Sequence, residues 1–82
     1  MGVSQATLRA QARLIQNTTW RCGKLEKAIV RHLYKYQKSF GRTEVSVRDI
    51  MVSLNITREK KDEWLGALGR LEKRNIVKIT TL

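Results

Sequence analysis

The stretch that decides the expected fold is VSVRDIMVSLNITREKKDEWLGALGRLEKRNIV, residues 45–77. Apolar residues recur in it every three or four positions, which predicts two amphipathic helices at about 47–54 and about 58–74. Ser46 and Thr57 stand where the N-terminal caps of these helices belong. About three residues join the two helices, which is the length of a helix-turn-helix connection. The stretch therefore predicts a close pair of helices on a shared core.

Further elements are expected on both sides of this pair. A helix of about residues 23–39 precedes it, with its apolar side chains on one face. Ser4 is a candidate cap for another short helix at about residues 5–16. Residues 43–47 and 76–82 are rich in β-branched side chains and predict a short strand and a C-terminal strand. The expected fold class is mainly α with a small β element, with about four helices.

The runs 45–50, 54–57 and 68–77 together resemble the winged-helix, or winged helix-turn-helix, DNA-binding superfamily. In that superfamily a short strand leads into the first helix of the motif, and the recognition helix closes into a wing hairpin. The resemblance covers about residues 24–79 and implies that the helix at about 58–74 enters the major groove of DNA. No second wing strand follows the predicted last strand, so we expect a truncated wing or one completed by another chain.

The charge of the chain indicates a polyanionic partner. The 82 residues include 17 Lys and Arg against 7 Asp and Glu, a formal net charge of +10 at pH 7. Residues 1–42 carry nine of the basic residues and a single acid, whereas residues 43–82 carry eight basic and six acidic residues. Nucleic acid is the first choice for such a partner, and an anionic membrane surface is the second.

Two predicted helices carry candidate contacts to nucleic acid. On the helix at about 23–39, five basic residues form one stripe about 80° wide, opposite the apolar stripe and uninterrupted by acids. The helix at about 58–74 begins with acids and ends with bases on its outward face, a pattern that equally suits the helix macrodipole. The candidate nucleic-acid-binding residues are Lys24, Lys27, Arg31, Lys35, Lys38, Arg48, Arg58, Lys60, Lys61, Arg70, Lys73 and Arg74.

The N-terminal segment is expected to serve assembly. We divide the chain into an N-terminal helix or arm, residues 1–22, and a winged-helix domain, residues 23–82. The apolar stripe of the short helix, Leu8, Ala12 and Ile15, is a candidate dimerisation surface, because two half-sites multiply the affinity of a small DNA-binding domain. A homodimer is therefore expected. A frayed basic arm that reaches DNA directly is the alternative.

Other classes of protein fit the sequence poorly. The acids are dispersed and no Gly-rich phosphate loop is present, so no catalytic residues are expected and the protein is predicted not to be an enzyme. The single His32 and single Cys22 cannot supply a metal-ligand set, and neither a cofactor nor a small-molecule ligand is expected. No apolar run is long enough for a membrane span, and no secretory signal begins the chain. These features favour an intracellular protein of the cytoplasm, nucleoid or nucleus.

The function predicted from the sequence is sequence-specific or architectural binding of double-stranded DNA by a small transcriptional regulator. A winged-helix protein-interaction module in a replication, transcription or other assembly is an alternative. The acidic start of the helix at about 58–74 and the missing wing strand favour this alternative, since the last strand could pair with a partner's sheet edge. An RNA-binding accessory protein is a further alternative that differs mainly in its ligand.

Overall fold

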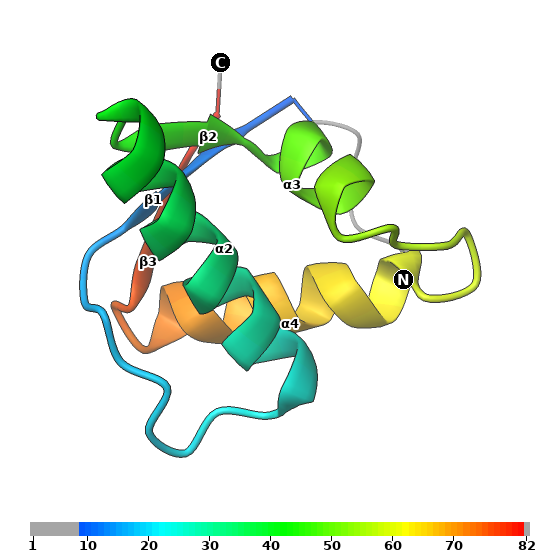
Figure 1. Ribbon diagram of the computed structural model, residues 1–82. Coiled ribbons are helices and arrows are strands. Elements are labelled where there is room, and N and C mark those ends of the chain that lie inside the picture. The colour runs from blue at the N-terminus through cyan, green and yellow to red at the C-terminus, as the bar shows by residue number, and fades with distance from the viewer. Residues whose placement is uncertain (1–8, 82) are drawn as a thin grey trace.

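The computed structural model describes residues 9–81, in which three helices cover a three-stranded antiparallel sheet (Figure 1). The chain forms a strand first, then a helix, a strand, two helices and a final strand. The elements are β1 (Gln11–Leu14), α2 (Lys24–Phe40), β2 (Glu44–Ser46), α3 (Val47–Ser53), α4 (Lys61–Lys73) and β3 (Val77–Thr80). None of these helices is long and apolar enough to cross a membrane.

The N-terminal strand β1 is the centre of the sheet. The strand order is β2-β1-β3, and both pairings are antiparallel. Ala12 lies opposite Val45 on one side and opposite Ile79 on the other. Ala10 and Ala12 are fully buried, whereas Arg13 is exposed, so the period-two pattern of β1 turns its small side chains toward the helices. These small side chains let α2 pack closely on β1.

The core lies between the sheet and the helices. Helix α2 contributes Ile29, Val30 and Leu33, and α2 also packs against α4. Burying each such side chain stabilises the fold by about 1.5–3 kcal/mol. Trp64 of α4 is fully buried, and its indole N–H has no hydrogen-bond partner among the described residues. The other buried apolar residues are Val45, Val47, Ile50, Leu65, Ala67, Leu68, Leu71, Ile76 and Val77.

The prediction of a short helix at about residues 5–16 is wrong, because residues 11–14 form β1. The apolar spacing of Ala12 and Ile15 suits a helix, but Ala10, Ala12 and Leu14 also alternate as in a strand. The sheet decides between the two, since β1 gains hydrogen-bonded partners on both edges. The predicted cap Ser4 and the predicted apolar residue Leu8 lie outside the described residues.

The prediction of a four-helix winged-helix fold is also wrong. Within residues 9–81 the structure has three helices and a three-stranded antiparallel sheet. The last strand, β3, needs neither a second wing strand nor another chain, because it pairs with β1. Residues 11–14, which lie within the segment predicted as an N-terminal helix or arm, form the central strand of this sheet.

The helix-turn-helix connection is longer than predicted. Helix α3 ends at Ser53 and α4 begins at Lys61, so residues 54–60 separate them. Asn55 takes a left-handed conformation with φ 54°, which Asn tolerates better than most residues. A turn closed by a hydrogen bond from the Lys60 N–H to the Thr57 carbonyl precedes the helix. Thr57 therefore stands one turn before α4 and does not cap it.

Candidate nucleic-acid interface

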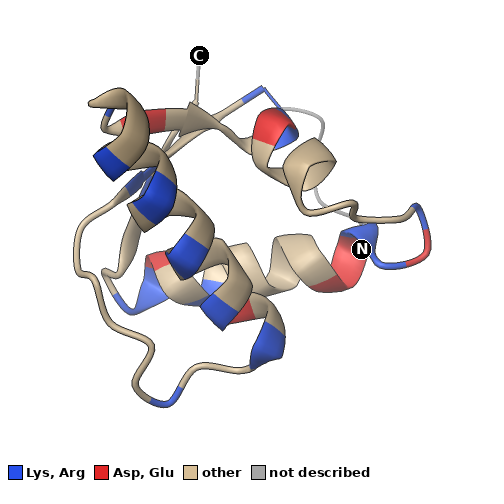
Figure 2. Ribbon diagram, viewed as in Figure 1, with Lys and Arg blue, Asp and Glu red and all other residues tan. Residues whose placement is uncertain are grey.

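One side of α2 carries a continuous row of exposed cations. We call Lys24, Lys27, Arg31, Lys35 and Lys38 the basic face of α2, and all five are exposed. Figure 2 shows them as successive blue bands along the helix. Since the opposite side of α2 packs Ile29 and Leu33 into the core, the fold itself holds the basic face toward solvent.

Within residues 9–81 the cations of the basic face form no ion pair. The described residues form three ion pairs, and none of them includes a residue of this face. From Lys24 to Lys38 the row extends about 21 Å at 1.5 Å per residue. Like charges four residues apart destabilise a helix by about 0.2–0.5 kcal/mol per pair. The basic face is therefore a straight row of positive charges that no neighbouring carboxylate in the described part of the chain compensates.

The cations near the end of α4 are arranged differently, because a carboxylate of α2 holds them. Glu26 is only 8% exposed. Its Oε1 accepts a hydrogen bond of 3.2 Å from the Nε of Arg70, and its Oε2 lies 3.9 Å from Nη1 of Arg74. A carboxylate this deeply buried requires such partners to stay charged. Arg70 and Arg74 thus neutralise Glu26 at the junction of α2 and α4.

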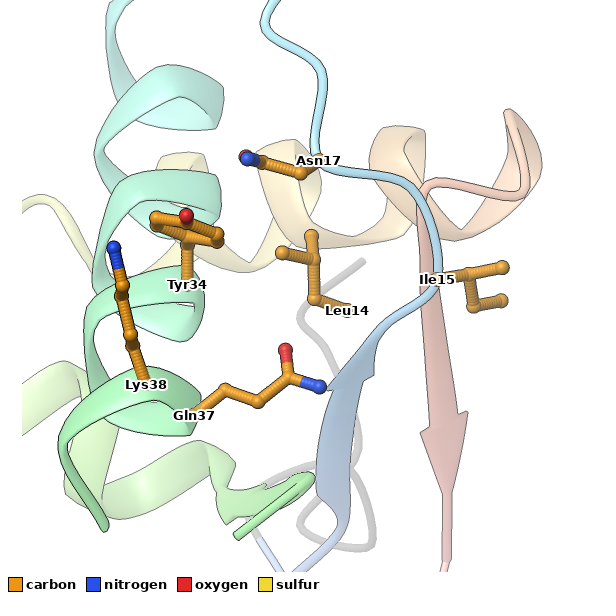
Figure 3. Close-up of a pocket in the computed structure, with 6 residues that line it drawn as sticks. All are labelled: Leu14, Ile15, Asn17, Tyr34, Gln37 and Lys38. Atoms are coloured by element: carbon orange, nitrogen blue, oxygen red, sulfur yellow. The ribbon is translucent and has the colours of Figure 1, made fainter. Parts of the chain in front are cut away.

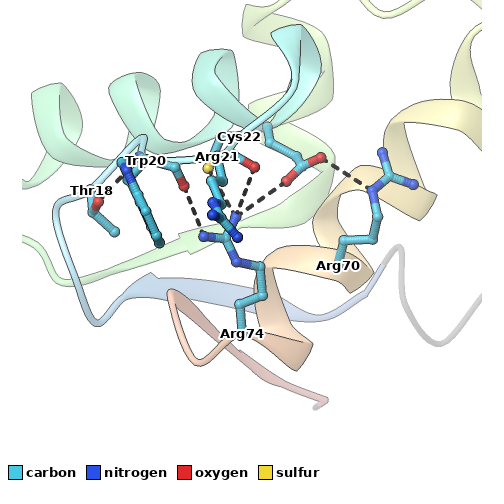
Figure 4. A network of polar contacts seen from close by, with 7 residues as sticks. Thr18, Trp20, Arg21, Cys22, Arg70 and Arg74 are labelled. Atoms are coloured by element: carbon cyan, nitrogen blue, oxygen red, sulfur yellow. Dashed lines mark hydrogen bonds and ion pairs between the residues drawn. The ribbon is translucent and has the colours of Figure 1, made fainter.

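Arg74 also fixes the loop that leads into α2 (Figure 4). Its Nη2 donates to the carbonyl oxygen of Trp20 at 2.8 Å, and its Nη1 donates to the carbonyl of Arg21 at 3.2 Å and to Sγ of Cys22 at 3.5 Å. Arg21 is held in a left-handed conformation with φ 56°. The guanidinium of Arg74 therefore satisfies backbone groups of a loop that has no regular secondary structure.

The remaining predicted contacts are scattered. Arg48 is exposed near the start of α3, while Arg58 is exposed in the turn before α4. Lys60 pairs with Glu63 at 3.4 Å, and both side chains are exposed. Lys61 is half-buried, and Lys73 is exposed near the end of α4. Of the twelve predicted residues, only the five on α2 form one continuous row.

Two of the predicted dimerisation residues, Ala12 and Ile15, lie in the described part of the chain and differ in exposure. Ala12 is fully buried in the core of its own chain, so its assignment to a dimer interface is wrong. Ile15 is exposed just beyond β1. Leu8 lies outside the described residues.

Two features of this region escape the sequence analysis. The partnership of Glu26 with Arg70 spans 44 positions, and no local pattern indicates it. His32 lies beside the basic face, where burial, and then the charge of Lys35, lower its pKa below 6.5. The sequence shows that basic residues flank His32, but it does not show that the His32 ring is partly buried.

The site is defined by charge alone within residues 9–81. No group of three His, Cys, Asp or Glu side chains there could hold a metal ion. Comparisons of the chain with models of protein families, with curated proteins and with solved structures found no match. The interface is therefore interpreted from its own geometry and electrostatics.

Proposed function

We propose that this protein binds double-stranded DNA by its phosphate backbone, using the basic face of α2. The observation that carries the proposal is the straight row of five exposed cations, none of which forms an ion pair with another residue in the range 9–81. Lysine and arginine side chains that meet phosphates release condensed counterions, and this release drives most sequence-independent DNA binding. The formal net charge of +10 adds long-range attraction to the same partner.

The shape of the array favours a duplex over a flexible strand. The five side chains project from one rigid helix, so their spacing is set before binding. Double-stranded DNA is also stiff, with a persistence length of about 50 nm. Two pre-ordered partners lose little conformational entropy when they meet, whereas a flexible single strand must be ordered along the helix.

The arrangement of α4 supports backbone binding without base reading by that helix. Arg70 and Arg74 are engaged with Glu26 and with loop carbonyls, and Asp62 and Glu63 occupy the first turn of α4. Carboxylates repel phosphates, so this end of α4 opposes entry into a groove. Because phosphate contacts position a protein but do not specify sequence, the proposed binding is architectural rather than sequence-specific.

A salt titration tests this proposal. The affinity for a fluorescent 20-base-pair duplex is measured by anisotropy at several salt concentrations. If all five cations reach phosphates, the slope of log K against log[salt] is expected near about −4.5. In the double variant Arg31→Gln/Lys35→Gln the slope becomes shallower by about 1.8.

The matched control changes the charge equally at a distance from the basic face. Arg58→Gln/Lys73→Gln removes two exposed cations near α4 that form no ion pair among the described residues. Its slope is expected to stay within about half a unit of the wild type, since it removes no contact. Equal changes in the two double variants would contradict the assignment to α2. Absence of duplex binding at low salt, or tighter binding of single strands or RNA, would overturn the proposal itself.

A further inference from the structure

A pocket of about 340 Å³ opens beside the basic face of α2. It lies between α2 and the chain that leaves β1, as Figure 3 shows. The lining residues are Leu14, Ile15, Asn17, Tyr34, Gln37 and Lys38. Lys38 belongs to both the pocket and the basic face, so a ligand in the pocket would lie next to the row of cations.

An aromatic ring with an adjacent cation forms one wall of this pocket. Tyr34 is 40% exposed although its neighbours on one side, Val30 and Leu33, are buried. The Nζ of Lys38 lies 5.6 Å from the centroid of its ring. Leu14 points toward the same space in Figure 3 and offers an apolar surface, whereas Ile15 points away. A flat apolar group and an anionic group are the two ligand features that such a wall accepts.

Two side-chain amides at the pocket are free to bond a ligand. The side chains of Asn17 and Gln37 form no hydrogen bond with another residue in the described part of the chain. Each amide offers both donors and an acceptor. The edges of nucleobases present the same mixture of donors and acceptors. The pocket thus combines a stacking surface, amides and a cation within one small volume.

We propose that this pocket takes one unpaired nucleobase of a DNA whose phosphates lie along the basic face of α2. The base stacks on Tyr34, and its edge bonds the amides of Asn17 and Gln37. The volume lies near the lower end of the range of about 300–1,000 Å³ typical of ligand pockets, which suits a single base. This inference rests on the proposed function, because the basic face supplies the phosphate contacts.

Another exposed aromatic side chain near α2, Trp20, is less suited to this role. Trp20 is 68% exposed, and the guanidinium of Arg21 lies 4.5 Å over its ring, closer than the 5.6 Å between Nζ of Lys38 and the ring of Tyr34. The neighbouring guanidinium of Arg74 is held by Glu26 and by loop carbonyls. The pocket beside Trp20 therefore has no side-chain amide in its lining, whereas Asn17 and Gln37 supply two beside Tyr34.

The inference predicts a preference for DNA that already contains an unpaired base. Removing a base from a perfect duplex costs unpairing and unstacking energy, whereas a bulged base has lost these contacts already. A 20-base-pair duplex with a single-nucleotide bulge is therefore expected to bind at least about fivefold more tightly than the perfect duplex, since one base stacked on an aromatic ring contributes about that much or more. Anisotropy titrations of the two DNAs against the full chain measure the ratio.

Substitutions in the pocket identify the residue responsible. Tyr34→Ala is expected to bring the affinity for the bulged duplex down to that for the perfect duplex, while Tyr34→Phe keeps the preference because the ring remains. Asn17→Ala, in a loop where folding is least at risk, is expected to reduce the preference in part. A 2-aminopurine base placed at the bulge should lose fluorescence on binding to the wild type and retain it with Tyr34→Ala. Circular dichroism checks that each variant is folded.

The outcomes separate the pocket from the function on which it rests. Equal affinity of the wild type for both duplexes would overturn the pocket assignment and leave binding by the basic face standing. An equal loss of affinity for both duplexes in a folded Tyr34→Ala protein would also overturn it, because the ring would then serve the phosphate contacts. Failure of either DNA to bind at low salt would overturn the proposed function as well.

Discussion

Helices α2 and α4 both carry basic residues on their outer sides, yet they use this charge in opposite ways. The five cations of the basic face of α2 are exposed and form no ion pair in the part of the chain that the structure describes. The two arginines near the end of α4 are engaged by a nearly buried carboxylate, Glu26, which α2 itself supplies. This contrast shows that the number of basic residues on a helix does not by itself locate a binding surface. What matters is whether each charge already has a partner.

The two helices also differ in what their charges do for the fold. Removing Arg74 takes the donor from two loop carbonyls and leaves Glu26 with Arg70 alone, so the fold is expected to lose stability. Removing a cation of the basic face breaks no ion pair among the described residues and relieves repulsion between neighbours four residues apart. Substitutions in α2 should therefore change DNA affinity, whereas substitutions in α4 should change stability. Experiments can test this contrast.

The largest effect is expected when the whole basic face is neutralised. The five-fold variant replaces the cations of this face by glutamine: Lys24→Gln, Lys27→Gln, Arg31→Gln, Lys35→Gln and Lys38→Gln. Affinity for duplex DNA at 0.1 M salt is expected to fall on the order of 10⁴-fold, because each lost phosphate contact costs about 0.9 log units there. The thermal unfolding midpoint is expected to stay the same or to rise. Anisotropy and circular dichroism measure the two quantities.

A matched five-fold variant separates the face from the total charge. It changes five cations outside the basic face: Arg48→Gln, Arg58→Gln, Lys60→Gln, Lys61→Gln and Lys73→Gln. Its net charge equals that of the first variant, yet a far smaller loss of affinity is expected. A comparable loss in both proteins would mean that binding follows net charge, and the contrast between the helices would then fail.

The next largest effect concerns the stability that Arg74 provides. Arg74→Met keeps the length of the side chain but removes its donors to the Trp20 and Arg21 carbonyls and its charge beside Glu26. The free energy of unfolding is expected to fall by about 1–3 kcal/mol, because two carbonyls lose hydrogen bonds from a charged donor and the buried Glu26 keeps only Arg70 as a partner. Urea denaturation measures this change.

The neighbouring lysine provides the control for Arg74. Lys73 is exposed and forms no ion pair among the described residues, so Lys73→Met should change the free energy of unfolding by less than about 0.5 kcal/mol. At 0.1 M salt both variants should bind duplex within about eightfold of the wild type, the effect of a single phosphate contact. If Arg74→Met kept full stability but lost most of its affinity, α4 would be the DNA-binding helix.

The sequence predicts the helices and two strands better than it predicts the fold. Helices α2, α3 and α4 and strands β2 and β3 lie within a few residues of the predicted ranges, because their apolar spacing and β-branched content are local signals. Strand β1 was missed, since Ala10, Ala12 and Leu14 satisfy a strand while Ala12 and Ile15 satisfy a helix. Only pairing with β2 and β3, more than 30 positions away, decides in favour of the strand.

In the candidate site, too, the local features could be predicted and the long-range contacts could not. The spacing of the cations on α2 predicts that they share one side of a helix, and the structure places them there. The state of Arg70 and Arg74 could not be predicted, because it depends on Glu26, which lies 44 positions before Arg70. The pocket beside Tyr34 likewise depends on how the chain leaving β1 passes α2. Charge at a surface can be predicted locally, whereas its partners require the tertiary fold.

A smaller change in the free energy of unfolding is expected when a glycine of either helix, Gly41 or Gly69, is replaced by alanine. Gly41 ends α2 with φ 67°, and a Cβ there would meet nothing within 4 Å. Gly41→Ala is therefore expected to lower the free energy of unfolding by about 1 kcal/mol through backbone strain alone. Gly69 lies inside α4, and a Cβ there would also be free of contacts. Gly69→Ala should stabilise by about 0.5–1 kcal/mol, and urea denaturation that gave the two changes the same sign would contradict this reading of the helix end.

The smallest effect concerns the charge that the basic face imposes on His32. Burial, and then the positive charge of Lys35, lower the pKa of His32 from its usual 6.5. The unfolded chain therefore binds more protons below this value, so stability is lost as pH falls through 6.5 and levels off below the lowered pKa of the folded state. Lys35→Gln removes the smaller cause and is expected to raise this pKa part of the way and to reduce the loss of stability in acid. An NMR titration of the His32 ring measures the pKa, and Lys73→Gln on α4 should leave it unchanged. If Lys35→Gln also left the pKa of His32 unchanged, burial alone would account for the shift, and Lys35 would exert no measurable field on this ring.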